Sequence, residues 1–533
     1  MKNGFANNCI LCLFFVLIFL FPVMRGVRSV ADSPLDAELE GFTDEAEPPV
    51  FTGESWWNGT FQSDFTSDFD GTLPLRGCLT RTYGSFRYGL FRVGNVEISE
   101  TGDVFGSDYL NAAACVGEYD FSDPGKQQML QETKAHLESI NRKLQAVGKK
   151  LLVYTASGKA TLYPGTMPRD YAALKTPEAV SGMALFRSLM EETDVPCLFC
   201  DDLIPKLDYP AFYPTGTHWS RTYEQICSRA ILQKICELTG TEGRNFELRA
   251  AQESDVPYWR DTDIYDLLNK WGYPDLTYYE YLTQVPEREG YEALDILLQG
   301  DSFAWGLMHD VAENLPEDRI AFISRCDSLR DDYGKDTLLK NDWARLDLQY
   351  CLDLNDVVVM EVLEPEILHP TYGFAAYLDA YLDTYVPQPK STYYAESFDG
   401  ALMSRPDLTC AKGFYKKELG YSWIQPRAGI RIREGEIPEK GMEITYLVPG
   451  EIFFLYPEDT VQIYVNGRKV ADRTYRGEQY ETLILTPEEV GDPVCGGYSV
   501  EFYCSEEFSP CEVGEGEDDR QLALRLEYVG GPR

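Results

Sequence analysis

One stretch constrains the fold of this chain more than any other, because it combines a buried strand with a candidate nucleophile. Residues 294–306 have the sequence LDILLQGDSFAWG. A short apolar run that ends in Gly-Asp-Ser is typical of a parallel strand that is buried on both faces. Open α/β sheets place their ligands at the carboxyl ends of such strands. The stretch therefore predicts a doubly wound parallel α/β sheet with Ser302 at its carboxyl edge.

Ser302 is the predicted nucleophile, and it needs a base. A helix that begins at Phe303 would point free N–H groups at a negative oxygen forming near the serine, and a base within hydrogen-bonding reach would take the serine proton. The chain has four histidines. His309 lies seven residues past Ser302, which on a helix is about 10 Å along the axis and too far for contact. His136 lies on a strongly amphipathic helix, where a solvated polar face is expected.

The two remaining histidines, His218 and His369, are the candidate bases. His218 lies in the loop FYPTGTHWS, which leads directly into a predicted helix over residues 221–238. A Thr-x-His-Trp-Ser element that opens a helix, followed downstream by a strand ending in Gly-Asp-Ser-Phe, resembles the SGNH hydrolase-like domain of the alginate O-acetyltransferases of the AlgJ/AlgX type. In that family the histidine precedes the serine in the chain, and His218 and Ser302 follow this order.

One position departs from the family pattern. The family motif is Asp-x-His-Trp, and its aspartate position is occupied here by Gly216. That aspartate orients the histidine and stabilises its imidazolium form. Three outcomes remain open, in which another carboxylate replaces the aspartate, the serine and histidine act as a dyad, or the site is degenerate. The candidates for replacement are Asp201, Asp202 and Glu361.

A rival base follows a second predicted buried strand, over residues 356–362. There Glu366 and His369 mimic the Asp-x-x-His motif of ordinary SGNH esterases. Only 67 residues separate His369 from Ser302, whereas ordinary members space these two blocks much farther apart. His218 is therefore the preferred base.

The resemblance also implies residues that bind substrate. In the family a lysine stands at the carboxyl end of the strand that corresponds to residues 151–154, and Lys159 occupies that place here. We expect Lys159, Asp301, Trp219 and Glu361 to bind substrate. For Lys159 the alternative is a solvated loop lysine.

The N-terminal region predicts export. Residues 10–23 form an apolar run that is too short for a spanning helix of about 20 residues and is typical of a signal peptide, although an uncleaved anchor remains open. In an exported protein, Cys197 and Cys200 form a disulfide or stay as two free buried thiols. Metal binding is not expected, because neither a second such pair nor a histidine cluster lies near them.

The net charge restricts the partners of the protein. The chain carries a formal charge of −39 at pH 7, and removal of residues 1–31, which hold three positive charges and no acid, leaves −42. Such a surface repels nucleic acid, anionic lipid and polyanionic glycans. The predicted acceptor is therefore a neutral polysaccharide rather than alginate itself.

Changes in sequence character divide the chain into four parts. Residues 1–31 form the signal peptide or anchor, 32–55 an acidic linker, 56–390 the SGNH hydrolase-like domain, and 391–533 a β-sandwich that is expected to hold or orient carbohydrate. The β-sandwich is assigned from short alternating runs with turn signals, such as Asn466-Gly467.

Two segments of the SGNH hydrolase-like domain carry further expectations. Residues 56–91 are rich in aromatic residues and contain Arg76, Arg81 and Arg87, and we expect them to pack structurally rather than to bind. Residues 255–289 form an aromatic and acidic insert. A calcium loop needs alternating oxygen ligands, a glycine turn and a closing glutamate, which the insert lacks, so we expect a lid or rim helix.

The resemblance implies acyl transfer onto hydroxyls of an extracellular or cell-surface polysaccharide. Ser302 would carry the acetyl group as a covalent ester, His218 would relay the proton, and the Ser302 amide would supply one oxyanion donor. In the family a membrane-bound acyltransferase hands over the acetyl group, so no cofactor is expected. The alternatives are an SGNH-type carbohydrate esterase and a glycan-binding or assembly protein with a degenerate site, which Gly216 favours.

Overall fold

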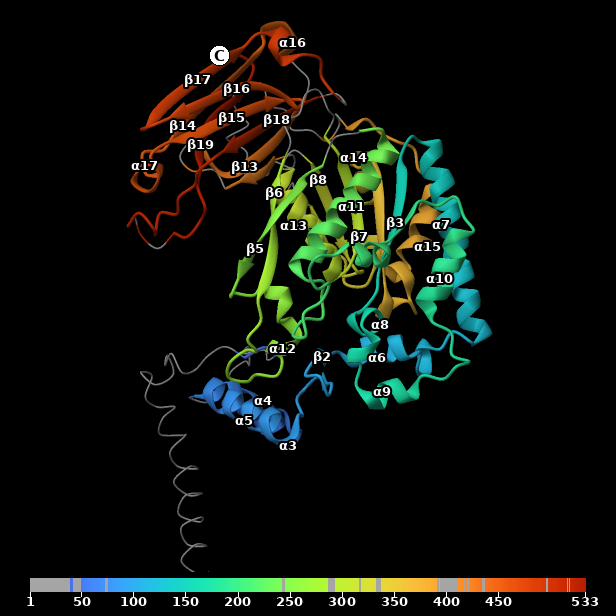
Figure 1. The fold of residues 1–533 in the computed structure, drawn as a ribbon. Coiled ribbons are helices and arrows are strands. Elements are labelled where there is room, and N and C mark those ends of the chain that lie inside the picture. The colour runs from blue at the N-terminus through green and yellow to red at the C-terminus, as the bar shows by residue number, and fades with distance from the viewer. Residues whose placement is uncertain are drawn as a thin grey trace, which may run out of the picture.

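The computed structural model of the chain contains two large sheets, one formed within residues 150–363 and the other within residues 411–530 (Figure 1). It describes residues 39–41, 49–71, 75–241, 245–285, 293–315, 318–331, 337–390, 393, 411–415, 418, 421–433, 437–494, 497–514, 516 and 518–533. The predicted signal peptide or anchor, and much of the acidic linker, lie outside the described residues. Among the residues that are described, no helix has the length and apolar character needed to cross a membrane.

The first sheet has seven strands in the order β10-β9-β8-β7-β11-β3-β4. The strands are β3 (Lys150–Ala156), β4 (Cys197–Phe199), β7 (Asp295–Gly300), β8 (Arg319–Ser324), β9 (Ser328–Asp331), β10 (Thr337–Leu338) and β11 (Val357–Leu363). Strands β8, β7, β11, β3 and β4 pair in parallel, whereas β9 and β10 add an antiparallel edge. The predicted parallel sheet is thus confirmed for five of the seven strands, and the sheet as a whole is mixed.

Helices cover both faces of this sheet (Figure 1). One core lies under α7 (Pro124–Ala146), α10 (Gly182–Glu191) and α15 (Phe374–Leu382), and the other under α11 (Arg221–Thr239) and α13 (Trp305–Asn314). Side chains of a strand alternate between the two faces. In β3, Leu151 and Val153 therefore join the first core, while Leu152 and Tyr154 join the second.

The order of the parallel strands explains why the histidine precedes the serine. We number the five parallel strands from β7 as 1, through β8 and β11, and then back to β3 and β4 as 4 and 5. In this numbering they lie side by side in the order 2-1-3-4-5, which is the flavodoxin-like arrangement. The chain enters this arrangement at β3, the fourth strand of that count, and reaches β7 only after β4. The loop after β4 therefore comes earlier in the sequence than the loop after β7. Ligands bind such sheets at the point where the strand order reverses, which here lies between β7 and β11.

The C-terminal domain is not the predicted two-sheet sandwich. It is one antiparallel sheet of eight strands in the order β16-β15-β18-β13-β19-β14-β17, with β12 paired to β13. The strands are β12 (Ala411–Phe414), β13 (Ser422–Arg433), β14 (Met442–Val448), β15 (Asp459–Val465), β16 (Arg468–Tyr475), β17 (Gln479–Leu485), β18 (Gly497–Cys504) and β19 (Leu524–Gly530). An ion pair between Arg473 and Glu481 joins the two edge strands, so the sheet curls into a nearly closed barrel.

The predicted hairpin at Asn466-Gly467 is confirmed in this barrel-like sheet. These two residues connect β15 to β16, which pair in antiparallel fashion. Their φ angles are 47° and 74°, the positive values that a tight two-residue hairpin turn requires. The alternating sequence pattern therefore predicted the position of the turn. It could not distinguish a sandwich from a barrel, because the strands of both have one inward and one outward face.

The two sheets meet at the end of the first sheet that is remote from Ser302. Asp295, the first residue of β7, is buried and accepts hydrogen bonds from Arg431 of β13 at 2.6 Å and from Lys390 at 2.7 Å. Lys412 of β12 donates to the carbonyl of Asp318 at 3.0 Å. Since β7 has six residues, about 20 Å of strand separates this junction from the serine. In the part of the chain that the structure describes, the C-terminal sheet does not contribute to the surroundings of Ser302.

Smaller elements complete the α/β part. Two two-stranded sheets are formed by β1 (Glu97–Ile98) with β2 (Val104–Phe105) and by β5 (Glu247–Ser254) with β6 (Tyr278–Gln284). The remaining helices of this part are α3 (Gly53–Trp57), α4 (Thr60–Gly71), α5 (Arg76–Phe91), α6 (Ser107–Ala114), α8 (Lys159–Leu162), α9 (Arg169–Leu174), α12 (Asp263–Asp266) and α14 (Leu348–Leu354). Cys197 and Cys200, at β4, are free thiols.

Candidate active site

Ser302 lies in a tight turn at the carboxyl end of β7. It begins the 3₁₀ helix η5 (Ser302–Ala304), which continues into α13. The Asp301 side chain caps this helix by accepting from the Phe303 amide at 2.9 Å. A Cβ atom at Gly300 would lie 2.6 Å from the Glu361 carboxyl, so the turn requires glycine there. The amide of Ser302 stands at the start of the helix, where N–H groups have no intrahelical acceptor.

His218 lies beside this serine. Its Nε2 atom is 2.7 Å from Ser302 Oγ. The imidazole ring packs against Phe303 with 4.7 Å between ring centroids, and Trp219 packs edge-on against the same phenyl ring at 5.4 Å. Ser220 caps the following helix α11 by accepting from the Tyr223 amide. Folding thus brings the predicted base and the predicted nucleophile into hydrogen-bonding distance.

The carboxylate behind the histidine is Asp263, which is none of the three expected candidates. Its Oδ2 atom is 2.5 Å from His218 Nδ1, and its Oδ1 atom accepts from the Thr217 amide at 2.7 Å. Asp263 is the first residue of α12, within the insert for which a lid or rim helix was expected. One carboxylate therefore fixes both the ring and the loop that carries it.

The three expected carboxylates are engaged elsewhere. Asp201 accepts from Ser157 Oγ at 2.7 Å, and Asp202 forms an ion pair with Arg187 at 2.9 Å. Glu361 lies on strand β11, under the turn that carries Ser302. The prediction that one of these three lies behind the histidine is wrong, because Asp263 occupies that place.

Gly216 explains how Asp263 reaches the histidine. A Cβ atom at residue 216 would lie 2.8 Å from the carbonyl oxygen of Arg260 and 3.1 Å from that of Asp261. Thr215 fastens the same segment by donating to the Asp261 carbonyl at 2.5 Å. The backbone that leads into α12 thus occupies the space that a side chain at residue 216 would need.

The four residues expected to bind substrate are all buried. Trp219, Asp301, Glu361 and Lys159 are at most 3% exposed. Their positions behind the serine and histidine indicate that they support the site from within.

Glu361 supports the serine turn from below. Its carboxyl group accepts from the Asp301 amide at 2.7 Å and from the Tyr154 hydroxyl at 3.0 Å. Burial, together with the nearby negative charge of Asp301, raises the pKa of Glu361 well above its ordinary value. The Glu361 carboxyl group, which accepts at both oxygens, therefore holds the turn of β7 against β3.

Lys159 is neither a solvated loop lysine nor exposed to a ligand. Its Nζ atom donates to the carbonyls of Val104 at 2.7 Å and Pro214 at 3.0 Å. Burial lowers its pKa to about 7. The ammonium group ties β2 to the loop that precedes His218, so its visible role is to hold that loop.

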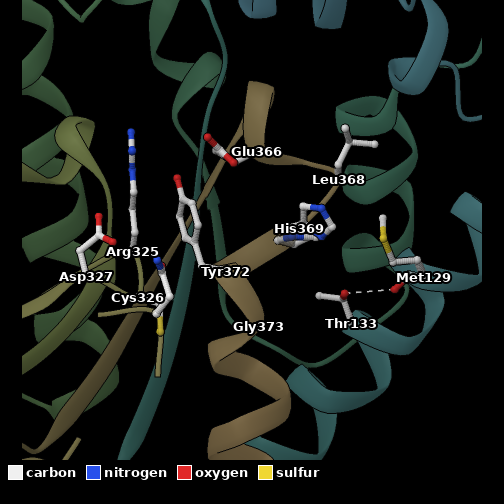
Figure 2. A pocket seen from close by; sticks show the side chains of 12 residues that line it. Met129, Thr133, Arg325, Cys326, Asp327, Glu366, Leu368, His369, Tyr372 and Gly373 are labelled. Atoms are coloured by element: carbon white, nitrogen blue, oxygen red, sulfur yellow. Dashed lines mark hydrogen bonds between the residues drawn. The ribbon is translucent and has the colours of Figure 1, made fainter. Parts of the chain in front are cut away.

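A pocket of about 560 Å³ opens next to the serine turn (Figure 2). Residues from α7, from the β8–β9 turn and from the loop after β11 line it. They are Met129, Thr133, Arg325, Cys326, Asp327, Asn341, Glu366, Leu368, His369, Pro370, Tyr372 and Gly373. Figure 2 shows the Arg325 and Tyr372 side chains next to each other, with His369 on the side toward Met129 and Thr133.

Two contacts join this pocket to the turn of the nucleophile. The Tyr372 hydroxyl donates to Asp301 Oδ2 at 3.2 Å, and the Arg325 amide donates to the Gly300 carbonyl at 2.7 Å. The rival base His369 lines the pocket, and within the described residues its side chain has no hydrogen bond to Ser302. The structure therefore brings His218, and not His369, to the serine.

Strained backbone is concentrated around the same pocket. Arg325, Asn341, Thr371 and Tyr372 have φ angles of 52°, 59°, 58° and 54°, in the left-handed region that residues other than glycine rarely adopt. Each such residue costs of order 1–3 kcal/mol and persists where the surrounding structure enforces it, most often at ligand sites. No sequence pattern signalled this feature.

One cluster of side chains could hold a metal ion among the residues described. It consists of His309, Asp310 and Glu313 on α13. Asp310 is already paired with the buried Arg221 at 2.8 Å. The cluster lies outside the group formed by Ser302 and His218, and we assign it no role.

The fold and the site together define a class of protein. A doubly wound sheet that presents a serine, a histidine and a carboxylate in hydrogen-bonded series at its carboxyl edge has the arrangement of serine hydrolases and of acyltransferases with the same chemistry. Residues 116–259 match the family described as "SGNH hydrolase-like domain, acetyltransferase AlgX". This stretch of the chain is thus similar to the SGNH hydrolase-like domain of the AlgX type, in agreement with the sequence resemblance. The matched range contains His218 and ends before Asp263 and Ser302.

The chain is distantly similar to curated and solved members of this group. It is 25% identical over 219 residues to the probable alginate O-acetylase AlgJ of Pseudomonas aeruginosa, which covers 40% of this chain and 51% of the relative. The chain thus spans about half the length of that relative.

Three solved structures are also similar to this chain. The O-acetyltransferase domain of Pseudomonas putida AlgJ is 16% identical with a TM-score of 0.35, and the match covers 53% of this chain and 98% of that one. Pseudomonas aeruginosa AlgX is 10% identical with a TM-score of 0.33, covering 82% and 95%. Bacillus cereus PatB1 with a sulfonyl adduct is 9% identical with a TM-score of 0.31, covering 46% and 92%.

Proposed function

We propose that this protein is a serine-dependent O-acetyltransferase that modifies hydroxyl groups of a neutral extracellular or cell-surface polysaccharide. The observation that supports it best is the hydrogen-bonded series from Asp263 through His218 to Ser302, with distances of 2.5 Å and 2.7 Å. In this series each group has the position that its role requires: a nucleophile, a base next to it, and a carboxylate that orients the base.

The first half of the reaction loads the serine. His218 Nε2 takes the Ser302 proton while Oγ attacks the carbonyl carbon of the donor ester, so a C–O bond forms and the carbonyl oxygen becomes negative. The Ser302 amide, free of an intrahelical acceptor, is positioned to donate to that oxygen. The intermediate then collapses, the bond to the donor oxygen breaks, and His218 returns the proton to the leaving alcohol. Asp263 stabilises the imidazolium formed in between.

The second half passes the acetyl group to the acceptor. His218 takes the proton of a sugar hydroxyl, whose oxygen attacks the acetyl-serine ester. Collapse of this second intermediate breaks the bond to Ser302 Oγ, which recovers its proton from the histidine. Atoms and protons balance over the cycle, and one acetyl ester is exchanged for another.

The pocket next to Tyr372 is our proposed acceptor site. Its volume of about 560 Å³ lies in the range of small-ligand sites, and its polar lining offers donors from Arg325 and Asn341 and acceptors from Asp327 and Glu366. Such a mixture suits the hydroxyl groups of a neutral sugar. The formal charge of −39 disfavours a polyanionic glycan.

Location and donor complete the proposal. We propose that the protein acts outside the cytoplasm, as the apolar run at residues 10–23 predicts, and that a membrane-bound acyltransferase supplies the acetyl group. The chain's own residues supply the rest of the chemistry.

The test is to follow an acetyl group from an activated acetyl ester onto the protein and then onto sugar. Intact-protein mass spectrometry should show one acetyl adduct on Ser302, absent in Ser302→Ala, and neutral oligosaccharides should discharge it into acetylated sugar. Release of acetate alone, at the same rate with and without sugar, would support an SGNH esterase instead. Absence of any adduct would support the alternative of a glycan-binding protein with an inactive site. That alternative was suggested by the missing aspartate at Gly216, whereas Asp263 supplies a carboxylate beside His218.

A further inference from the structure

Helix α5 carries an apolar stripe that faces away from the protein. The stripe consists of Leu79, Tyr83, Phe86 and Leu90, whose spacing of four, three and four residues places them on one face of the helix. The four residues are between 44% and 63% exposed. Over this distance the stripe is about 16 Å long. The expectation that residues 56–91 serve structural packing is therefore wrong for this face.

The other side of α5 is fixed to the protein. A Cβ atom at Gly84 would lie 2.4 Å from the carbonyl oxygen of Asn269 and 2.6 Å from that of Leu268, so backbone packs directly against backbone. Ser85 Oγ accepts from the Trp271 amide at 2.8 Å. Because this docked side lies roughly opposite the stripe around the helix, the stripe has no freedom to turn inward.

Neighbouring helices extend the aromatic surface. On α4, the rings of Phe61, Phe65 and Phe69 stack in series with centroid separations of 6.0 Å and 6.2 Å. Trp57, at the end of α3, is 87% exposed. We call helices α3, α4 and α5 the entry helices. Figure 1 shows them at the end of the molecule opposite the C-terminal sheet.

The charge of α5 differs from that of the rest of the chain. Arg76, Arg81, Arg87 and Arg92 lie on or next to the helix, and residues 71–96 contain no acidic residue, although the whole chain carries −39. The Arg87 guanidinium lies 5.6 Å from the ring of Tyr83, so its aliphatic part runs along the stripe. Exposed Trp, Tyr, Phe and Leu beside arginines are the composition of helices that lie in a membrane interface.

We infer that the entry helices lie on a lipid bilayer, with the stripe of α5 inserted among the headgroups. The chain itself points to this partner, because the apolar run at residues 10–23 precedes α3 by about 30 residues. A segment of about 30 residues can span at most about 100 Å, so a membrane that holds the run is within reach of the stripe. This inference does not depend on the proposed chemistry.

The contact would orient the active site. Helix α5 packs on Leu268 and Asn269, a few residues after Asp263, whose carboxylate contacts His218. A bilayer under the entry helices would therefore face the carboxyl edge of the sheet, while the C-terminal sheet would point away from it. A donor that delivers acetyl groups at the membrane would meet the serine on this side.

The experiment uses the full chain with phosphatidylcholine vesicles that contain a photoactivatable phosphatidylcholine. After illumination, peptide mapping should find lipid adducts on residues 79–90. Phe454 and Ile484, at 72% and 64% exposure in the C-terminal domain, are the matched control and should carry none. The inference is overturned if adducts are confined to residues 10–23, or if Phe454 and Ile484 are labelled as strongly as the stripe.

A variant gives a second readout. The triple change L79S/F86S/L90S removes exposed side chains, so folding, followed by circular dichroism, should be unchanged. It should abolish adducts on α5 and weaken vesicle binding several-fold, while F454S/I484S should bind as the unchanged chain does. Equal vesicle binding by both variants, with adducts retained on residues 79–90, would mean that the stripe does not insert.

Discussion

Asp263 contacts His218 at 2.5 Å, although 45 residues separate them in the chain. The contact depends on the absence of a side chain at Gly216, since the backbone that leads to Asp263 occupies the place of its Cβ atom. Gly216 and the segment that carries Asp263 are therefore two parts of one packing arrangement. This arrangement places a carboxylate from another segment of the chain against the imidazole.

The first prediction concerns the Asp263 carboxylate. Asp263→Asn should lower the rate of acetyl transfer by about 10²- to 10⁴-fold, because the amide no longer stabilises the imidazolium or fixes the required tautomer. Stability should change little, since the amide oxygen still accepts from Thr217. The measurement is turnover of an activated acetyl ester, with urea unfolding as a check on folding. Asp201→Asn is the matched control, and an equal loss of activity there would contradict the assignment.

Local sequence patterns were sufficient for part of this site. The run that ends at Ser302 predicted a buried strand, and β7 has six buried residues in the expected place. The exclusion of His309 depends on helical spacing, which fixes the distance along the axis, and that of His136 on its place on the polar face of an amphipathic helix. His136 is partly exposed and pairs with Asp379. These features depend on short-range geometry, which a sequence records directly.

Asp263 was missed because its contact depends on long-range packing. The insert around it lacks the pattern of a calcium loop and predicts a lid or rim helix, and no short-range pattern links its acids to His218. The available signal was Gly216, since a glycine in place of an expected side chain can mark close approach of another backbone segment. The near closure of the C-terminal sheet into a barrel could not be predicted for a similar reason. Closure depends on which strands pair and not on the alternation of residues along each strand.

The second prediction concerns Gly216. Gly216→Ala should destabilise the protein by about 1–3 kcal/mol and lower the rate as well, because the new methyl group meets the Arg260 and Asp261 carbonyls and displaces Asp263. Thermal unfolding and ester turnover measure the two effects. Gly165→Ala adds the same group where nothing lies within 4 Å, and it should be neutral. A neutral Gly216→Ala would show that the insert is not packed as described.

The third prediction concerns the support under the serine turn. Glu361→Gln should retain most of the stability, because burial already favours the uncharged carboxyl group and the amide has nearly the same shape. Glu361→Ala should cost about 2–5 kcal/mol, since it leaves the Asp301 amide and the Tyr154 hydroxyl buried without an acceptor. Chemical denaturation of the two variants checks the difference. Equal destabilisation would argue for a charged carboxylate at this position.

The fourth prediction is a pH dependence of stability. Glu364 accepts from the Gly158 amide at 2.7 Å and from Thr161 Oγ1 at 2.6 Å, and burial raises its pKa from 4.5 to about 7. The folded state thus keeps a proton that the unfolded chain releases near pH 4.5. The resulting stability is fully present below pH 4.5 and is lost as the pH rises to about 7, by roughly 3 kcal/mol in total.

Replacement of this residue isolates the effect. Glu364→Gln cannot titrate, so the stability of the unchanged chain relative to this variant should fall between about pH 5 and about pH 8 in urea unfolding. Glu178→Gln, at an exposed residue, should leave the pH dependence as it is. A constant difference between the unchanged chain and Glu364→Gln across this range would mean that the folded state does not hold the proton.

The last prediction separates the acceptor site from the acyl chemistry. Arg325 lines the pocket, and its backbone is tied to the turn of Ser302 through the Gly300 carbonyl. Arg325→Gln keeps the backbone group and removes a charged donor, whose hydrogen bond to a ligand contributes about 1.5–3 kcal/mol. The KM for an acceptor oligosaccharide should therefore rise about tenfold or more, while acetylation of Ser302 by a small activated ester should proceed at an unchanged rate. Arg169→Gln, at an arginine of α9 whose side chain is 86% exposed and pairs with Glu100, is the matched control and should alter neither quantity. A loss of serine acetylation in Arg325→Gln would mean that the arginine acts on the reacting ester, and an unchanged KM would place the acceptor outside this pocket.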